Sequence, residues 1–218
     1  GVGEPEEVLE IVGRDRPMPG EGQVRLRVSA AALGLPDVLM CRGSYPLTPE
    51  LPFIPGQDVS GVVTAVGEGV SEDLVGRRVM GVTAFYAGWG GFATETLAAV
   101  GTIYDAPEAL SDADAAAFYI PFHTAWIALN QRARLAQGQT LLVLGGAGGS
   151  GAAAIQLGAA LGAEVIAVAG GPVKAEFCRR MGASVVVDHT TGYVSSSVLD
   201  ATEGRGVDVI FDPVGGSA

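Results

Sequence analysis

The chain of 218 residues has few of the side chains that build disulfides and metal centres. It contains only two cysteines, Cys41 and Cys178, and two histidines. Two cysteines exclude a disulfide scaffold and a structural zinc site of four cysteines, because each needs more thiols. With so few imidazoles as well, we expect no metal site built from the protein's own side chains. The scarcity of cysteine is typical of a reducing, cytoplasmic location.

Positive charge is also scarce. The chain has 13 lysines and arginines against 24 acidic residues, for a net charge of −11. Nucleic-acid and anionic-membrane surfaces need clustered basic residues, so we expect neither partner. No residue from Leu135 to Ala163 is charged, but the glycines within this stretch favour a buried strand, loop and helix over a membrane span.

The first half of the chain, residues 1–118, is predicted to be a β-rich domain. Apolar and polar residues alternate over 23–30, as in a half-buried strand. Further strands are expected at 62–66, 79–82 and 92–97. Four prolines between positions 46 and 55 predict a loop, because proline cannot sit in a central strand.

The pattern changes at Leu110, and the second domain is predicted over residues 119–218. Ser111 and Asp114 form a helix-capping signature, and Pro121 is expected to interrupt the helix that follows. Beyond it, strands are predicted at 140–144, 164–169, 184–187 and 207–211, separated by helices at 151–161, 174–181 and 194–201. This alternation predicts an α/β fold with a parallel, doubly wound sheet.

A glycine-rich loop lies between the first of these strands and its helix. Its residues are Gly145, Gly146, Ala147, Gly148, Gly149, Ser150 and Gly151. The spacing of Gly145, Gly148 and Gly151 is a variant of the dinucleotide fingerprint, in which backbone N–H groups approach a pyrophosphate at a helix N-terminus. We therefore expect residues 145 and 147–151 to bind a dinucleotide.

Three alternatives share this loop. A phosphate-binding Walker A loop fails because Ala152 stands where a lysine is required. A serine-hydrolase elbow at Ser150 needs a later Asp followed by His, and His189 comes too early in the fold. A glycine-rich turn without any ligand is the third alternative.

The residues after the second parallel strand bear on the choice of cofactor. NAD enzymes place an acid there to bind the ribose hydroxyls, but this chain has Gly170 and Gly171. The missing carboxylate permits the 2′-phosphate of NADP, and Lys174 supplies a cation, unless it is a solvated helix residue. His189 either lines the adenine-ribose pocket or is an ordinary surface histidine.

Several motifs in order resemble those of the medium-chain dehydrogenase/reductases, and most closely their zinc-free, zeta-crystallin-like NADPH:quinone oxidoreductase branch. The resemblance covers essentially the whole chain. It is carried by residues 51–61 (LPFIPGQDVSG), 65–70 (AVGEGV), 90–93 (GGFA), 124–126 (TAW), the glycine loop and residues 211–216 (FDPVGG).

The resemblance implies a GroES-like catalytic domain over 1–118 and a Rossmann NADP-binding domain over 119–218, both incomplete in this chain, with NADPH held between them. Zinc-dependent relatives carry a histidine at the position of Gln57 and a cysteine near that of Asp37. Cys41 is displaced from the ligand position, so we expect a packed thiol and no zinc.

The resemblance also implies roles for individual side chains. Tyr45 falls where zinc-free relatives place a tyrosine facing the nicotinamide pocket, and it is the candidate proton donor; the alternative is a loop aromatic that covers apolar surface. Thr124 matches a threonine that contacts the cofactor, with a core helix hydroxyl as the alternative. Relatives often have Asn where this chain has Gly34, so one polar contact is expected to be missing.

The predicted function is NADPH-dependent transfer of hydride to a quinone or an activated carbon–carbon double bond without zinc. An enoyl-thioester reductase is the alternative among enzymes, and a non-catalytic, crystallin-like or regulatory nucleotide-binding protein is the alternative among binding proteins. The expected partners are a small-molecule acceptor of the quinone or enoyl type and, in the full-length protein, a second copy in a homodimer.

Overall fold

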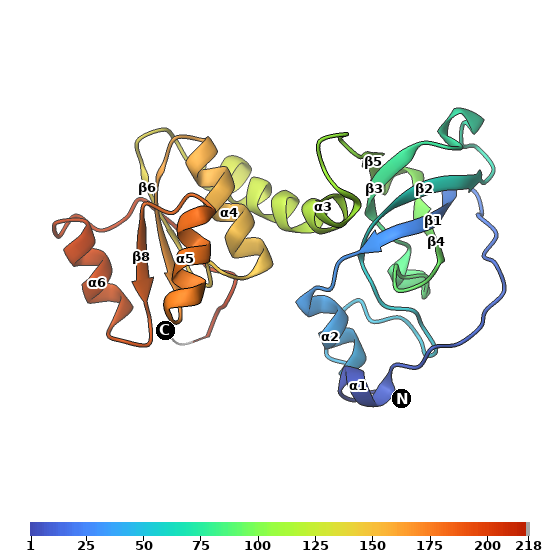
Figure 1. The fold of residues 1–218 in the computed structure, drawn as a ribbon, viewed down its shortest axis with the longest axis horizontal. Helices are drawn as coiled ribbons and strands as arrows, with labels where there is room; N and C mark the ends of the chain where they lie inside the picture. Colours follow the sequence, from blue (N-terminus) through green and yellow to red (C-terminus); the bar gives the residue numbers. More distant parts are fainter. Residues whose placement is uncertain (217–218) are drawn as a thin grey trace. The chain divides into compact units, whose positions relative to one another are not determined.

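The computed structural model describes residues 1–216, and the chain divides into two compact units, Gly1–Ile120 and the part that begins at Pro121. The first unit is built on an antiparallel sheet and the second on a parallel sheet (Figure 1). The predicted α/β fold class is confirmed. Within the described residues, no helix is long and apolar enough to cross a membrane.

The sheet of the first unit has the strand order β4-β1-β2-β3-β5. Val24 and Leu26 of β1 are fully buried with Val59 and Val63 of β2, so the predicted alternation is correct. The strands are β1 (Gln23–Ala31), β2 (Asp58–Val66), β3 (Arg78–Val82), β4 (Glu95–Ala99) and β5 (Ile103–Asp105).

Short helices and loops complete this unit. The helices are α1 (Pro5–Val8) and α2 (Leu35–Cys41), with 3₁₀ turns at Glu72–Leu74, Phe85–Ala87 and Val100–Thr102. The prediction that β4 starts at Phe92 is wrong. The N–H groups of Gly91 and Phe92 donate to the carbonyls of Gly56 and Pro55 at 2.7 and 3.0 Å, which ties this backbone to the proline-rich loop.

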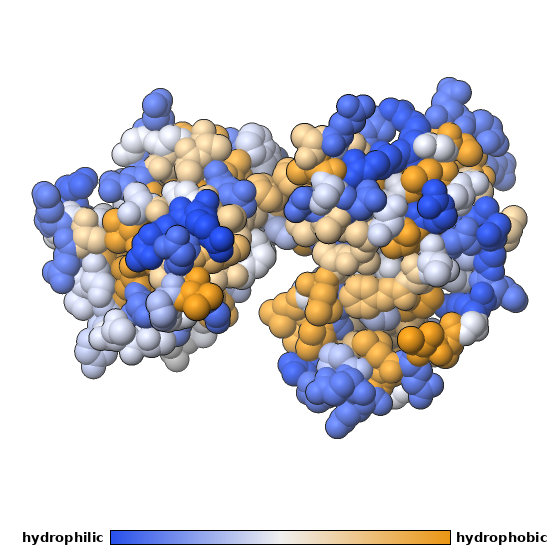
Figure 2. All heavy atoms as spheres, in the orientation of Figure 1, coloured by the Kyte–Doolittle hydropathy of each residue, from blue (hydrophilic) through white to orange (hydrophobic). Residues whose placement is uncertain are grey.

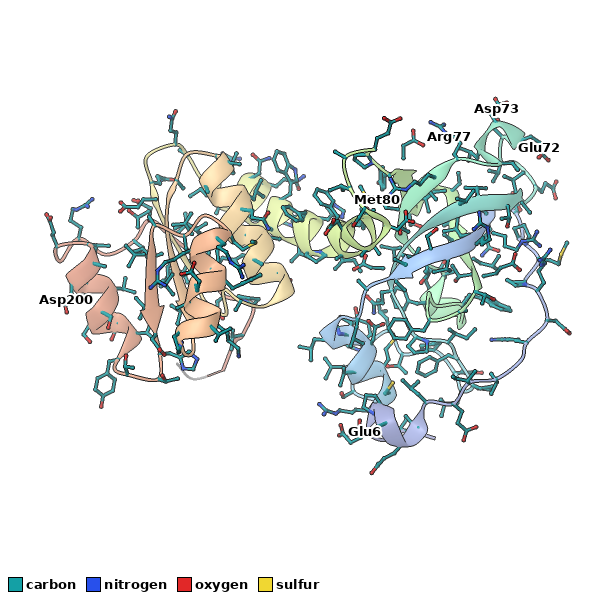
Figure 3. The ribbon with its side chains drawn as sticks, viewed as in Figure 1. Glu6, Glu72, Asp73, Arg77, Met80 and Asp200 are labelled. Atoms are coloured by element: carbon teal, nitrogen blue, oxygen red, sulfur yellow. The ribbon has the colours of Figure 1, made fainter. Side chains whose placement is uncertain are left out.

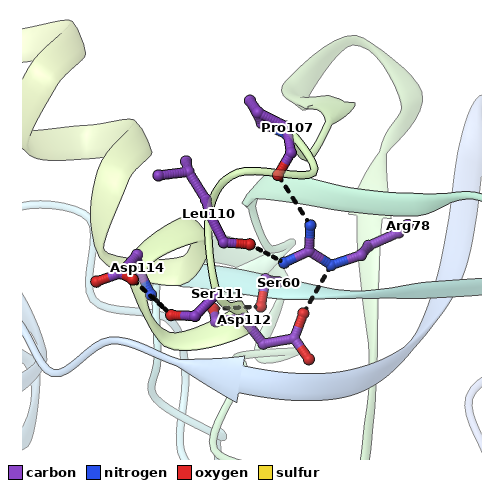
Figure 4. A network of polar contacts seen from close by, with 7 residues as sticks. All are labelled: Ser60, Arg78, Pro107, Leu110, Ser111, Asp112 and Asp114. Carbon is purple, nitrogen blue, oxygen red and sulfur yellow. Dashed lines mark hydrogen bonds and ion pairs between the residues drawn. The ribbon is translucent and has the colours of Figure 1, made fainter.

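A polar network fixes the start of α3 (Asp112–Trp126) to the antiparallel sheet (Figure 4). Arg78 on β3 donates to Asp112 Oδ1 at 2.8 Å and to the carbonyls of Pro107 and Leu110. Ser60 on β2 donates to the Asp112 carbonyl at 2.7 Å. The predicted Ser111 cap is confirmed, since its Oγ accepts from the Asp114 N–H at 3.1 Å. The residues before Pro121 are thereby held against β2 and β3.

Two hydrophobic features of the first unit accompany this network. Met80, labelled on β3 in Figure 3, packs beneath α3 with Ala106 and Ala115. Apolar side chains that remain exposed gather over α2 and its neighbouring loops (Figure 2). They include Leu33, Leu35, Leu47 and Leu51.

The predicted interruption at Pro121 does not occur, because α3 runs through this residue to Trp126 and continues as a π-helical segment, Ile127–Arg132. Proline removes one backbone donor and crowds the preceding turn. The N–H of Ile120, one residue earlier, points to Asp58 Oδ1 at 3.4 Å. A side chain of β2 thus supports the helix at the position where proline weakens it.

The parallel sheet of the second unit has the order β8-β7-β6-β9 and buried side chains on both faces. Leu141 and Val143 pack with α4 on one face, while Leu142 and Ile166 pack toward α6 on the other. This is the doubly wound arrangement predicted from the sequence. The elements are β6 (Thr140–Val143), α4 (Gly149–Ala160), β7 (Glu164–Ala169), α5 (Pro172–Arg180), β8 (Val185–Asp188), α6 (Val194–Ala201) and β9 (Val209–Phe211).

Candidate functional site

The glycine loop connects β6 to α4, and its shape depends on the absence of side chains. Gly145 has a φ of +61°, which L side chains rarely adopt. A Cβ on Gly151 would lie 2.2 Å from the Gly145 carbonyl oxygen. A Cβ on Gly146 would meet Ala167, Cys178 and Ile155 at 3.1 Å. The loop therefore folds back tightly on itself and on the sheet, and only glycine permits this.

The N-terminus of α4 presents backbone donors without competing side chains. Gly148 is the N-cap, and neither a capping side chain nor an acidic residue occurs in the first turn. Gly148 and Gly149 are exposed, while Ala147 and Ser150 are half-buried. The first N–H groups of a helix have no intrahelical partner, and the helix dipole adds positive potential there. This end of α4 fits the pyrophosphate of a dinucleotide.

The loop also stands where the order of the parallel strands reverses. β6 pairs with β7 on one side and with β9 on the other. In open α/β sheets, ligands bind beside such a switch point, at the carboxyl ends of the strands. The segment after β9 reaches the same place, because a Cβ on Gly145 would lie 2.8 Å from Val214 Cγ2. Residues 211–216 therefore border the glycine loop.

A second group of predicted residues lies at the carboxyl ends of β7 and β8. A Cβ on Gly170 would lie 2.8 Å from His189 Nε2, and Gly171 is the N-cap of α5 with a φ of +79°. Lys174 is exposed in the first turn of α5 and is the only lysine of the chain. The structure brings residues 170, 171 and 189 together at the start of the helix that carries Lys174.

Sequence reasoning missed Asp188, the last residue of β8. Its Oδ2 accepts from the Gly171 N–H at 3.1 Å, and its Oδ1 accepts from the backbone and hydroxyl of Thr190. These hydrogen bonds, with those of Thr190 the largest, lower the pKa of Asp188. The sequence signal for Asp188 is its position at the end of a strand, where it pairs with Ala169 at the end of β7. A carboxylate thus lies beside the loop at Gly170 and Gly171, although none directly follows β7 in the sequence.

Thr124 lies on the part of α3 that belongs to the second unit, and it is exposed. Pro121, one turn earlier, lies close to the glycine loop: a Cβ on Gly149 would be 3.8 Å from Pro121 Cγ. Thr124 therefore belongs to a helix that passes beside the start of α4.

Tyr45 lies in the first unit, in the loop that follows α2. The backbone N–H of Ser44 donates to the Leu39 carbonyl at 2.9 Å, which fixes this loop to α2. The Tyr45 carbonyl accepts from the Thr48 hydroxyl at 2.7 Å, and the Tyr45 side chain is half-buried. The tyrosine thus extends from a loop with a defined backbone.

Asp37, in the first turn of α2, holds two loops with one buried carboxylate. Its Oδ2 accepts from the Gly34 N–H at 2.8 Å. Its Oδ1 accepts from the N–H groups of Gly56 and Gln57 at 2.8 and 3.2 Å. Hydrogen bonds to three backbone donors explain how a side chain that is only 3% exposed remains in the core.

These residues do not fit a zinc ion. The Asp37 oxygens are occupied by backbone donors, and the amide of Gln57 is not among the usual zinc ligands. Burial, and then the negative charge of Asp37, raise the pKa of Cys41, which disfavours its thiolate form. Within residues 1–216, no three His, Cys, Asp or Glu side chains are grouped as a metal site.

Asp58, the first residue of β2, is a second buried carboxyl group in the first unit. Burial raises its pKa to about 7, while the hydrogen bond from Ile120 opposes the shift and the charge of Asp37 adds to it. Tyr119 on α3 has a pKa raised to about 12 by burial and by its hydrogen bond with Tyr104. The start of β2 therefore carries a carboxyl group able to hold a proton near neutral pH.

The chain is similar to known proteins both in parts that match families and over most of its length. The family "Alcohol dehydrogenase GroES-like domain" matches residues 20–108, and the family "Zinc-binding dehydrogenase" matches residues 149–218. The chain is 39% identical over 213 residues to the phthioceranic/hydroxyphthioceranic acid synthase of Mycobacterium tuberculosis. It is 38% identical over 198 residues to the quinone oxidoreductase-like protein 2 homolog of Nematostella vectensis.

The aligned parts differ in how much of each relative they represent. They cover 97% of this chain and 10% of the synthase, and 90% of this chain and 53% of the Nematostella protein. The chain thus spans about half the length of the quinone oxidoreductase-like relative and a tenth of the synthase.

Solved structures of three proteins share the fold. The quinone oxidoreductase of Coxiella burnetii aligns with a TM-score of 0.89 and 32% identity over 99% of this chain and 67% of that one. The Escherichia coli quinone oxidoreductase complexed with NADPH aligns at 0.91 and 28%, over 100% and 65%. The CurK enoyl reductase aligns at 0.82 and 29%, over 93% and 62%.

The two family matches follow the order of the two units along the chain. The antiparallel unit carries the GroES-like match, and the match to the zinc-binding dehydrogenases starts at the first residue of α4. The chain therefore belongs to the medium-chain dehydrogenase/reductase superfamily and to its quinone oxidoreductase-like branch.

Proposed function

We propose that the protein is an NADPH-dependent oxidoreductase that reduces a quinone or an activated carbon–carbon double bond without zinc. The observation that carries the proposal is the glycine loop, whose open helix N-terminus stands at the strand-order reversal. Similarity to quinone oxidoreductases, one of them complexed with NADPH, supports the cofactor and the acceptor. When bound, the nicotinamide dinucleotide supplies the hydride.

The chain's own residues would bind the cofactor, bind the acceptor and supply the proton. Residues 145 and 147–151 bind the pyrophosphate through backbone N–H groups, and Thr124 contacts the cofactor from α3. Gly170, Gly171, Lys174 and His189 surround the adenosine ribose, where Lys174 pairs with the 2′-phosphate. Tyr45 donates a proton or a hydrogen bond to the acceptor oxygen. The exposed apolar residues near α2 offer an apolar surface for such an acceptor.

An enoyl thioester is the second candidate acceptor. The specific observation in its favour is similarity to the CurK enoyl reductase and, at 39% identity, to the phthioceranic/hydroxyphthioceranic acid synthase of Mycobacterium tuberculosis. Reduction of an enoyl thioester also requires hydride and a proton, so the same residues would serve both acceptors.

The test is an acceptor screen on the full-length protein. NADPH is titrated first, and a benzoquinone or crotonyl thioester is then added. We expect NADPH to bind and one acceptor to be reduced, and the preferred acceptor selects between the two candidate reactions. Binding of NADPH without turnover of either acceptor would instead favour a non-catalytic nucleotide-binding protein.

Tyr45→Phe tests the proton-donor role within this screen. General acid catalysis contributes roughly 10²–10⁴-fold, so kcat should fall by up to this factor while NADPH affinity stays normal. The loss should be larger with the enoyl thioester, because reduced quinone oxygens are weak bases that water can protonate. Unchanged turnover with both acceptors would show that Tyr45 only packs in its loop.

We also propose that the active protein needs no zinc, is located in the cytoplasm and forms a homodimer at full length. Two buried, unpaired cysteines suit a reducing compartment. Elemental analysis should find no stoichiometric zinc, and chelators should leave turnover unchanged. Zinc held at one ion per chain would contradict this, and sedimentation would test the dimer.

A further inference from the structure

Buried polar side chains of the first unit gather near the start of β2, and most of them have hydrogen-bond partners in the protein. Asp37 accepts from three backbone N–H groups. Thr83 donates to the Gly56 carbonyl at 2.8 Å, and Ser60 donates to that of Asp112 at 2.7 Å. Asp58 accepts from Ile120. Within residues 1–216, the single buried side-chain nitrogen or oxygen without a partner is Nε2 of Gln57.

The backbone around Gln57 is held from several sides. Its N–H donates to Asp37 Oδ1 at 3.2 Å, and its carbonyl accepts from the Thr83 N–H at 2.9 Å. Gly56, one residue earlier, has a φ of +103°, and a Cβ there would lie 2.8 Å from the nitrogens of Gly91 and Phe92. The side chain of Gln57 therefore extends from a backbone that is held in place, and Gln57 is only 5% exposed.

An unpaired amide in a core is unfavourable, because it loses its bonds to water and gains none in the protein. Methionine has nearly the same length, packs well in cores and carries no such donor. The other buried side-chain nitrogens and oxygens within residues 1–216 have partners, so none of them needs the Gln57 donor. The missing acceptor therefore lies outside residues 1–216.

We propose that the Gln57 amide is a specificity-determining hydrogen-bond donor for the carbonyl oxygen of the electron acceptor, an inference that rests on the proposed function. A donor of this kind binds an oxygen more strongly as negative charge develops on it. Three side-chain torsions let the amide turn toward the acceptor, and no protein hydrogen bond of Nε2 is broken when it does.

The placement of Gln57 agrees with this role. Asp37 in the first turn of α2 holds residues 56 and 57, and Leu39 of the same helix holds the loop of Tyr45 through Ser44. A helix of seven residues is roughly 10 Å long. One short helix thus anchors both loops, and Gln57 would bind the oxygen while Tyr45 supplies the proton.

The test compares Gln57→Met with the wild type in the full-length protein. We expect kcat/KM for the benzoquinone or enoyl thioester to fall by roughly 10²–10³-fold, the effect of removing one oxyanion-hole donor. The Kd for NADPH should stay within about twofold, and Tm should be equal or higher because the unpaired donor is gone. Gln57→Asn, which keeps a shorter donor, should recover part of kcat/KM.

Thr96→Val is the matched control, because Thr96 is fully buried and its hydroxyl has a partner, the Trp89 carbonyl at 2.9 Å. This variant should lower Tm without a selective loss of kcat/KM. The proposal is overturned if kcat/KM of Gln57→Met stays within about twofold of wild type, or if its Tm falls as far as that of Thr96→Val.

A binding measurement separates this proposal from the proposed function. If the wild-type protein reduces no acceptor, the proposed function fails. Calorimetric binding of 4-hydroxyacetophenone, a ketone that takes no part in turnover, is then compared between the wild type and Gln57→Met with NADP⁺ present. A Kd at least about tenfold weaker in the variant supports the donor role, and equal or absent binding overturns it.

Discussion

The two units carry their candidate functional polar groups in opposite ways. In the parallel unit, the donors are backbone N–H groups at the start of α4, and the loop before it has glycine wherever a Cβ would collide. In the antiparallel unit, the polar groups are side chains removed from water, with Asp37, Gln57 and Asp58 at 3%, 5% and 8% exposure. The parallel unit thus presents backbone donors to solvent, and the antiparallel unit keeps polar side chains in its interior.

Because of this contrast, we expect the two regions to respond differently to substitutions and to pH. A backbone site fails when an added Cβ alters the path of the chain, even if every polar side chain remains. A buried side-chain site keeps its fold only if its charges and hydrogen bonds stay balanced, so pH and isosteric substitution act on it. Four predictions test this contrast.

Gly151→Ala should have the largest effect, because the new Cβ would lie 2.2 Å from the Gly145 carbonyl oxygen. The loop must open, and at least two charge-assisted hydrogen bonds to the pyrophosphate are lost. Since each contributes about 1.5–3 kcal/mol, the Kd for NADPH should rise roughly 10³-fold. Calorimetric titration measures this loss.

The control is Gly192→Ala, where a Cβ would meet nothing within 4 Å. Its NADPH affinity should equal that of the wild type. Tight NADPH binding by Gly151→Ala, with the fold verified by circular dichroism, would show that the loop does not hold the pyrophosphate.

Asp58→Asn tests the antiparallel unit through pH. Burial raises the folded pKa of Asp58 from 3.8 to about 7, so the folded state keeps a proton that the unfolded state releases. Wild-type stability should therefore fall as pH rises from about 4 to 7 and then level off, a loss on the order of 3 kcal/mol from this group. Urea unfolding across this pH range measures it.

The Asn variant lacks this titration, so its stability relative to the wild type should increase from pH 4 to pH 8. Tyr119, whose pKa is raised to about 12, keeps its proton in both proteins throughout this range. A constant difference across the range would mean that the pKa of Asp58 is the same in the folded and the unfolded protein.

Lys174→Ala should have the smallest effect, because its side chain is exposed and makes one proposed contact. The Kd for NADPH should rise about tenfold, the loss of one screened charge-assisted contact, while that for NADH stays the same. Fluorescence titration with both cofactors measures the ratio. Equal affinities of the wild type for NADPH and NADH would refute the preference itself.

Asp188→Asn tests the preference for NADPH by removing a negative charge near Lys174 in place of the positive one. Its carboxylate accepts from the Gly171 N–H at the start of the helix that carries Lys174. Removal of this negative charge should tighten NADPH binding and leave NADH nearly unchanged. A weaker affinity for both cofactors would instead assign Asp188 to holding the shape of the loop.

Much of the fold follows from local patterns along the sequence. The alternation over residues 23–30 gives β1, the Ser111 cap gives the start of α3, and the strand–glycine–helix spacing gives β6 and α4. These features depend on residues that are close in the chain, where side-chain periodicity and capping act directly. The glycine loop could be located for the same reason.

Other features arise only when distant segments meet. Asp37 takes its role from residues 56 and 57, Asp58 supports a helix 62 residues later at Ile120, and Asp188 closes the loop at Gly171. No local pattern marks these carboxylates, because their partners are backbone N–H groups that every residue type except proline provides. Local sequence patterns locate the glycine loop between β6 and α4. Contacts between distant segments decide which side chains are buried and which are paired, since desolvation and hydrogen bonding depend on neighbours in space. They also leave Gln57 as the one buried side chain within residues 1–216 with an unpaired donor.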